Sequence, residues 1–176
     1  LKLSKNSDNL IYMKKLLTIL CLVLLVSCSN KDPEEELVER QGITYETNST
    51  TPFTGSSVSY HDNGQLKEKI NYKDGKKHSL SEGYFENGQL NYKNNWKNGE
   101  EVGLYEWFYE NGQLIYKVNR KNGIRDGLSE RFYVNSQLRN KGNYKDGKQE
   151  GLWEYFDRDG NLTDTKEWKN GELIKQ

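Results

Sequence analysis

The sequence predicts an all-β fold, an elongated antiparallel β-meander built from five 24-residue hairpin repeats. Glycine recurs every 24 residues without exception, at Gly75, Gly99, Gly123, Gly147 and Gly171. Each repeat also carries two turn-forming dipeptides, and the segments between them are rich in the aromatic and β-branched residues that favour strands. The 176-residue chain contains no alanine, a strong helix former, but has 12 Tyr and 16 Gly.

The repeats span residues 55–78, 79–102, 103–126, 127–150 and 151–174, with no insertion or deletion. Two further columns keep the same interval: Leu66, Leu90, Leu114, Leu138 and Leu162, and Tyr60, Tyr84, Phe108, Phe132 and Phe156. Three positions depart from the pattern: Ser79 and Ser136 replace glycine, and Arg120 replaces a Tyr or Trp. A single unit of this size buries too little to be stable alone, so we expect stacked neighbours to supply the stability.

Two turn signals alternate along the chain. The first is Asn-Gly or Asp-Gly at residues 63–64, 87–88, 111–112 and 159–160. The second is Asp-Gly or Asn-Gly at residues 74–75, 98–99, 122–123, 146–147 and 170–171. Both dipeptides tolerate positive φ and are the strongest short-range signals for a hairpin. Two strands per repeat give an expected total of ten.

Two registers fit the first set of turns. Two-residue type I′ turns place Glu106 opposite Lys117, whereas three-residue turns with a glycine bulge place Phe108 beside Leu114, with Trp96 on that face. Because a shift of one residue swaps the two faces of a strand, the registers exclude each other. The bulged register is favoured, since it gathers the aromatic and Leu columns into one apolar strip whose burial outweighs exposed Glu–Lys pairs.

The N-terminal residues predict an export signal with a lipid anchor. A basic start at Met13-Lys14-Lys15 precedes an apolar run of eleven residues, 16–26, which is too short to span a bilayer but is typical of a signal peptide. The run ends in Leu-Val-Ser-Cys28, which resembles the bacterial lipobox. We therefore expect residues 1–27 to be upstream residues and a signal peptide that starts at Met13, residues 28–41 a lipidated Cys28 with a flexible acidic tether, and residues 42–176 the repeat domain.

The repeated units resemble a known family. The segments Tyr72-Lys-Asp-Gly-Lys76, Trp96-Lys-Asn-Gly99 and Gly103-x-x-x-x-Phe-x-x-Asn-Gly-Gln-Leu114 are similar to MORN repeats, particularly the bacterial variant associated with an antitoxin label. The resemblance covers residues 55–174 with a lead-in at 52–55. It implies an elongated β-sheet that contacts proteins or lipids.

No catalytic site or cofactor is expected. His61 and His78 are the only histidines, and both lie near turns, where we expect them to be solvated. Removal of the signal peptide leaves 22 basic and 25 acidic residues, and Cys28 is the only cysteine left. The repeated Glu and Lys columns, which include Glu106 and Lys117, are typical of a structural, solvated face. The sequence therefore predicts a protein that is not an enzyme, binds no metal and does not bind nucleic acid.

The candidate partner-binding residues are aromatic and lie in the last three units: Tyr105, Trp107, Tyr109, Tyr133, Trp153 and Tyr155. In the bulged register they point away from the Leu strip, and amphipathic rings gathered on one face suit a protein or glycan partner. Alternatively, the rings form a second thin core or pack on each other across strands.

Three functions are compatible with the sequence. The first is a membrane-anchored scaffold in the bacterial cell envelope that binds a protein partner, with an antitoxin-like role as one form of this function. The second is a cell-wall or glycan-binding module that uses the exposed aromatic rings. The third is binding of phospholipid head groups through the Lys column, which a mature net charge of −3 disfavours.

Overall fold

The computed structural model describes residues 37–175, and every element in that range is a β-strand. Cys28, the signal peptide and residues 28–36 of the tether lie outside the described residues. Residues 37–175 contain no helix long and apolar enough to cross a membrane. The strands are β1 (Leu37–Arg40), β2 (Ile43–Glu46), β3 (Gly55–Tyr60), β4 (Leu66–Lys73), β5 (Lys76–Tyr84), β6 (Leu90–Lys97), β7 (Glu100–Phe108), β8 (Leu114–Lys121), β9 (Ile124–Phe132), β10 (Leu138–Lys145), β11 (Lys148–Phe156), β12 (Leu162–Lys169) and β13 (Glu172–Lys175).

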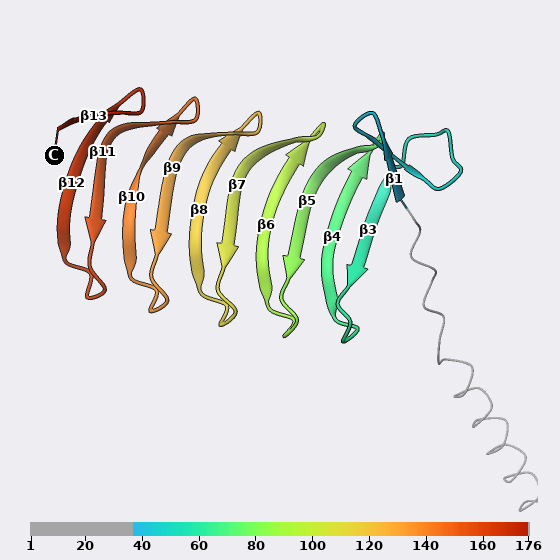
Figure 1. Ribbon diagram of the computed structural model, residues 1–176, viewed down its shortest axis with the longest axis horizontal. Helices are drawn as coiled ribbons and strands as arrows, with labels where there is room; N and C mark the ends of the chain where they lie inside the picture. Colours follow the sequence, from blue (N-terminus) through green and yellow to red (C-terminus); the bar gives the residue numbers. More distant parts are fainter. Residues whose placement is uncertain (1–36, 176) are drawn as a thin grey trace, which may run out of the picture. The chain divides into compact units, whose positions relative to one another are not determined.

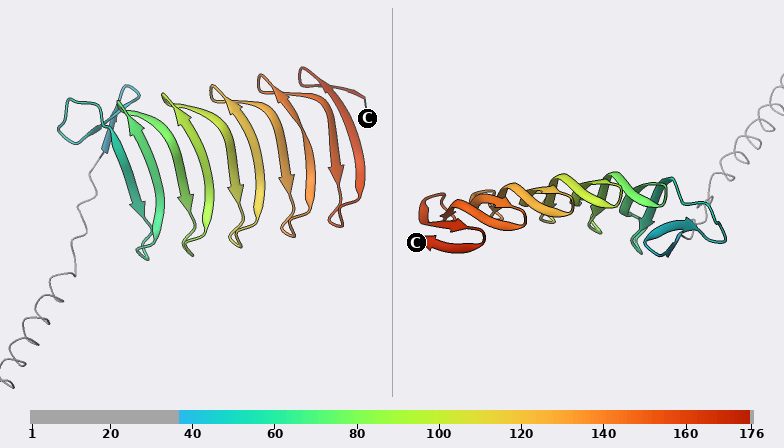
Figure 2. Two further views of the ribbon diagram at one scale, coloured as in Figure 1. Left: turned by 180° about the vertical axis from the view of Figure 1, so that it is seen from behind. Right: turned by 90° about the horizontal axis from the view of Figure 1, so that it is seen from above.

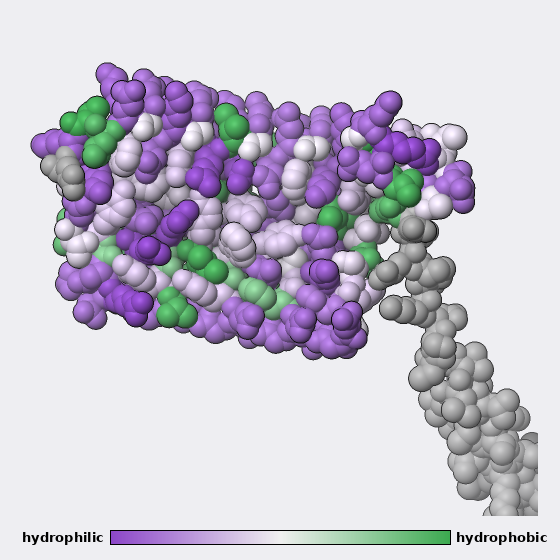
Figure 3. Space-filling model, in the orientation of Figure 1, coloured by the Kyte–Doolittle hydropathy of each residue, from purple (hydrophilic) through white to green (hydrophobic). Residues whose placement is uncertain are grey.

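Strands β3 to β13 form one antiparallel sheet in which each strand pairs with its neighbours in the chain, so the predicted meander is confirmed (Figure 1). The sheet has eleven strands rather than the expected ten, because residues after the last turn add β13. Seen from above, the strands form a single layer, and no described residues form a second layer over it (Figure 2). Hydrophilic groups line the two turn-bearing edges, and apolar groups form a narrow, interrupted band between them (Figure 3).

A two-stranded hairpin, β1–β2, precedes the repeats. The expectation of a flexible tether as far as residue 41 is therefore wrong for residues 37–40, which pair with β2. The backbone N–H of Thr44 donates to the carbonyl oxygen of Gly75 at 2.9 Å, and the N–H of Phe53 donates to that of Thr44 at 2.9 Å. Phe53 is buried and its ring packs edge-on against Tyr72 at 5.7 Å. The hairpin and the lead-in thus bond to the turn at Gly75, between β4 and β5.

The two turn signals form two different turns. In the third repeat the N–H of Tyr109 donates to the Gln113 carbonyl at 2.8 Å and the N–H of Gly112 to the Tyr109 carbonyl at 2.9 Å, which is a three-residue loop with Gly112 at φ 82°. At the other edge, Asn122 and Gly123 have φ values of 50° and 77°, as a two-residue type I′ turn requires.

Both registers that fit the sequence are present in the same hairpin. Phe108 lies opposite Leu114, as the three-residue turn requires, but Glu106 lies opposite Lys117. Ile115 is an extra residue in β8, and this β-bulge moves the register by one. The prediction that the two registers exclude each other is therefore wrong. The equivalent bulge in β6 places Trp96 and Leu90 on different faces of the sheet. The prediction that Trp96 lies on the same face as the Leu column is therefore wrong.

The two faces of the sheet differ in chemistry. One, the ladder face, carries the Phe and Leu columns together with the Glu and Lys columns. Lys93, Lys117 and Lys141 each bond to the glutamate of the following unit and lie over the Phe ring of that unit. The Nζ of Lys117, for example, is 2.6 Å from Glu130 Oε2 and 5.8 Å from the Phe132 ring centre. Charge on this face is therefore compensated unit by unit.

The other face, the aromatic face, contains the most deeply buried side chains. Val118 is 0% exposed and Trp153 only 4%, whereas Leu162 on the ladder face is 54% exposed. The ring of Trp153 occupies the space that a Cβ on Gly142 would need, so the opposite glycine allows the ring to lie flat on the sheet. The core of this single-layer sheet is thus the second thin core considered above, and the Leu strip is only partly buried.

Hydrogen bonds between turns join successive units at the first turn edge. The Nδ2 of Asn63 donates to the Glu86 carbonyl of the next unit at 2.7 Å, while its Oδ1 accepts from the N–H of Gln65 at 3.0 Å. The same bond between units recurs from Asn87 and Asn135, at 3.1 and 2.8 Å. At these three positions the asparagine therefore closes its own turn and binds the next one. Asn111 differs, because its Nδ2 donates to Gln113 Oε1 in the same turn at 3.1 Å.

The opposite edge of the sheet repeats this principle with backbone groups. The N–H of Gly123 donates to the Glu101 carbonyl at 2.9 Å, and Gly99, Gly147 and Gly171 make the equivalent bond. Both ends of every hairpin are thus bonded to an adjacent unit, which makes the stack cooperative.

Truncation of Val118 tests the position of the core. We expect Val118→Ala to lower the free energy of unfolding by about 1.5–2.5 kcal/mol, because it removes two buried methyl groups. The matched control is Val134→Ala, since Val134 is 55% exposed and the substitution is the same. Urea denaturation followed by circular dichroism measures both. Equal losses of stability in the two variants would contradict a core on the aromatic face.

A second test concerns Tyr92, whose hydroxyl donates to the Glu68 carboxylate of the preceding unit. Burial, this hydrogen bond and the negative charge of Glu68 raise the pKa of Tyr92 above its ordinary value of 10.0. The folded state therefore retains a proton that the unfolded state releases, so stability is present in full below pH 10.0 and falls as the pH rises above it. We expect Tyr92→Phe to show a smaller loss of stability than the wild type between about pH 9 and pH 11 in denaturation at each pH. Parallel pH profiles would show that this tyrosine does not carry the effect.

Candidate functional site

Two rows of side chains cross the strands on the aromatic face. In the first row, Trp107, Tyr116 and Arg131 lie directly opposite one another on β7, β8 and β9. In the second, Tyr105 lies opposite Val118, which lies opposite Ser129. The alternation of Tyr105 and Trp107 along one strand thus brings both rings to the same face, as the sequence predicted.

The structure divides the six predicted aromatic residues. Trp107 is 47% exposed, and its Nε1 donates to Asn91 Oδ1 at 2.6 Å. Trp153 is buried, packs edge-on against Tyr144 at 5.3 Å and donates to the Asn143 carbonyl at 3.3 Å. A buried ring cannot touch a partner in the folded state, so the prediction of Trp153 as a binding residue is wrong and its role is in the core.

The remaining predicted rings lie at the edges of this face. The hydroxyls of Tyr109 and Tyr133 donate to the carbonyls of Phe132 and Phe156 in the following unit, at 3.3 and 2.9 Å. These two rings therefore help to join the units as well as to line the surface. Tyr155 is half-buried beneath Lys166, whose Nζ lies 5.4 Å from the ring centre.

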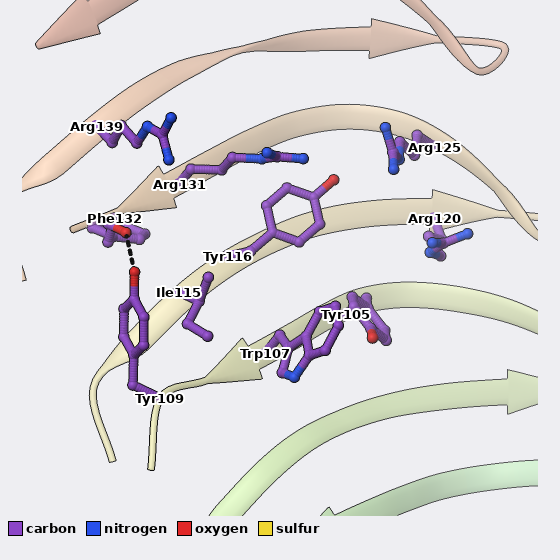
Figure 4. Close-up of a pocket in the computed structure, with 10 residues that line it drawn as sticks. All are labelled: Tyr105, Trp107, Tyr109, Ile115, Tyr116, Arg120, Arg125, Arg131, Phe132 and Arg139. Atoms are coloured by element: carbon purple, nitrogen blue, oxygen red, sulfur yellow. Dashed lines mark hydrogen bonds between the residues drawn. The ribbon is translucent and has the colours of Figure 1, made fainter. Parts of the chain in front are cut away.

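Tyr105, Trp107 and Tyr109 line a groove of about 270 Å³ across β7 to β10, here called the arginine groove (Figure 4). Its other lining residues are Ile115, Tyr116, Arg120, Arg125, Arg131, Phe132 and Arg139. Tyr133 and Arg158 line a second hollow that shares Tyr109 and Arg139 with the first. The predicted residues Tyr105, Trp107, Tyr109 and Tyr133 are thus gathered along one continuous part of the surface.

The arginines are the groove residues that sequence reasoning missed. Five of the six arginines of the chain lie between residues 120 and 158, an asymmetry visible in the sequence. Their guanidinium groups are held against tyrosine rings. The guanidinium carbon of Arg131 is 5.0 Å from the Tyr116 ring centre, and that of Arg125 is 5.1 Å from the ring centre of Tyr144. These cation–π contacts fix the positions of the charges.

The groove carries an excess of positive charge. Arg120 Nη1 is 2.9 Å from Glu101 Oε2, but Arg120 also lies directly opposite Arg125. Arg125, Arg131 and Arg139 have no carboxylate within salt-bridge distance among residues 37–175. Since arginine keeps its proton in proteins, these charges persist at any physiological pH.

Tyr105 lies beside the one acid–base pair of this groove. Burial raises the pKa of Tyr105, the Glu101 carboxylate raises it further, and the Arg120 guanidinium opposes both effects. The phenol therefore stays protonated at neutral pH and can act as a hydrogen-bond donor. Together these groups suit the binding of an anionic ligand that also presents an apolar surface.

The histidines differ from expectation. His61 Nε2 is 2.8 Å from the carbonyl oxygen of Tyr84 in the next unit, so His61 joins two units and is not a solvated turn residue. His78 Nδ1 is buried without a hydrogen-bond partner. Within the described part of the chain, no group of three His, Cys, Asp or Glu residues is placed to hold a metal ion.

A comparison with protein families matches five segments to the MORN repeat variant, at residues 53–74, 77–98, 101–122, 125–146 and 149–175. No protein of curated function gives a significant match.

Two solved structures resemble the chain with a TM-score of 0.34 each. A structure of accessory secretory protein 1, 2 and 3 in Streptococcus pneumoniae is 13% identical over 76% of this chain and 24% of that one. A structure of S. aureus TarM in complex with Fondaparinux, alpha-GlcNAc-glycerol and UDP is 12% identical over 73% and 23%. The chain spans about a quarter of the length of each of these proteins.

Because the five matched segments cover more than half of the sequence, the chain belongs to the MORN repeat variant family.

Proposed function

We propose that this protein is a lipid-anchored, non-enzymatic repeat scaffold that binds a protein partner in the bacterial cell envelope through the arginine groove. The observation that carries the proposal is the surface around Trp107, an indole that is 47% exposed beside guanidinium groups without carboxylate partners. Trp, Tyr and Arg are the residues that contribute most to binding energy at protein interfaces. An antitoxin-like role is the special case in which the partner is a toxin.

The sheet suits a scaffold because its binding surface is fixed before a partner arrives. The groove residues lie on strands whose two ends are bonded to adjacent units, as at Asn87 and Gly123. Side chains on such strands lose little conformational freedom on binding, which favours affinity. The groove provides recognition, and no arrangement of residues described above supplies a nucleophile with its base.

A glycan-binding module remains the second candidate, because the exposed indole of Trp107 offers a flat apolar surface of the kind on which sugar rings stack. The phospholipid hypothesis loses its basis in the Lys column. Lys93, Lys117 and Lys141 bond to glutamates at 2.6–3.0 Å on the ladder face, so their charges are already compensated.

The test is a crosslinked pull-down from intact envelopes that compares wild type with Trp107→Ala. We expect the wild type to capture one predominant protein and Trp107→Ala to lose most of it, because the variant removes the main exposed anchor. The matched control is Trp168→Ala, a change of the same residue type outside the groove. Circular dichroism confirms that both variants are folded. Glycan fragments captured in the same pattern would favour the second candidate, and an identical catch from all three proteins would contradict a role for the groove.

The lipid anchor is tested separately. We expect Cys28→Ala to move the protein from the membrane fraction to the soluble fraction, because the thiol that would carry the lipid is absent. Fractionation without detergent followed by immunoblotting measures the distribution. Unchanged membrane association of a cleaved Cys28→Ala protein would show that another segment or a bound partner holds the protein at the membrane.

A further inference from the structure

A comparison of equivalent positions in the five units shows which residues the fold requires. Residues that recur every 24 positions, such as Leu114 and Gly123, are the ones that build each unit. The arginines of the groove do not recur. At the position of Arg131 the other units carry Ser59, Gly83, Trp107 and Tyr155, and at that of Arg139 they carry Lys67, Asn91, Ile115 and Thr163. The fold therefore does not demand arginine at these positions, although they meet around one groove.

The same holds for the other two arginines. Arg120 replaces the Tyr or Trp of every other unit, and the residues equivalent to Arg125 are Lys77, Glu101 and Gln149. Arg120 and Arg125 are nevertheless directly opposite each other on neighbouring strands. Like charges in that arrangement destabilise a sheet, and the single carboxylate of Glu101 compensates only one of them. An anionic ligand in the groove would relieve this repulsion.

The chemistry of the groove defines the anion. A guanidinium group is a planar fork that binds a carboxylate through two parallel hydrogen bonds, and stacking of Arg131 on Tyr116 keeps this fork in place. Between the arginines the wall is largely apolar, with the indole of Trp107, the side chain of Ile115 and the ring of Tyr116. The ligand must therefore combine separate negative groups with an aromatic or aliphatic group.

We propose that the arginine groove binds an extended acidic peptide segment of the partner, with two or three carboxylates beside an aromatic or aliphatic side chain. This rests on the proposed function and names the chemistry of the partner. The groove crosses four strands, about 14 Å at 4.8 Å per strand, which equals about four to five residues of extended peptide. A long polyanion fits less well, because the arginines are confined to one part of a chain whose mature net charge is −3 and the apolar wall has no counterpart in a uniform polyanion.

The experiment is a screen of the purified full chain in detergent micelles against a library of random octapeptides. We expect enrichment of Asp or Glu at two or more positions together with an aromatic or aliphatic residue, and weaker binding as salt is raised. Arg125→Gln/Arg131→Gln should bind the selected peptides at least about tenfold more weakly. The control, Lys93→Gln/Lys117→Gln, removes the same two charges from the ladder face and should bind normally.

A second variant, Arg125→Lys/Arg131→Lys, keeps the charge but loses the planar fork, and we expect it to bind about threefold more weakly or worse. Selection without acidic residues, or an equal loss in the Arg→Gln and Lys→Gln pairs, would overturn the proposal. So would binding of heparin or of phosphatidylglycerol vesicles that depends on Arg125 and Arg131 while no acidic peptide is selected. An envelope protein that is lost in Trp107→Ala but retained by the arginine variants would leave the scaffold function standing and would reject the acidic peptide.

Discussion

The structure depends on one constraint: both turns of every hairpin hydrogen-bond to an adjacent unit. At one edge the asparagine side chain donates to a carbonyl of the next unit, as from Asn63 to Glu86. At the other edge a glycine N–H, as in Gly123, donates to a carbonyl 22 residues earlier. An insertion of one residue in any strand would break both sets of bonds and also exchange the faces of that strand. This explains why five units run without a change in length.

That constraint fixes the turns and leaves much of the aromatic face free. The ladder face repeats closely, because the Lys of one unit bonds to the Glu and lies over the Phe ring of the next, as Lys93 and Lys117 do. The aromatic face only needs enough bulk to bury its backbone, and Val118, Trp153 and the Gly83–Tyr92 pair meet this need in different ways. The aromatic face therefore tolerates more variation than the ladder face, and a binding site can arise there without loss of the fold.

The sequence predicted those features of the fold that are encoded within a single unit. The period, the turns and the meander depend on glycine and asparagine at positive φ, and these residues are visible one unit at a time. The bulge that reconciles the two registers falls at Lys67, Asn91, Ile115, Arg139 and Thr163, which share no chemical type. No pattern could reveal it. The arginine groove was missed for a similar reason, since its charges come from different positions of different units.

The same geometry explains how a thin sheet can hold uncompensated charge. Opposed arginines on β8 and β9 weaken the pairing of these strands locally, but the strands are also held at both turns and by the Lys117–Glu130 ion pair on the ladder face. Because the two faces of a strand alternate residue by residue, the ladder face stabilises the very segments in which the aromatic face is destabilised. The repulsion is thus confined to side chains at a rigid surface. At that surface the repulsion between the arginines favours binding of an anionic ligand and does not unfold the unit.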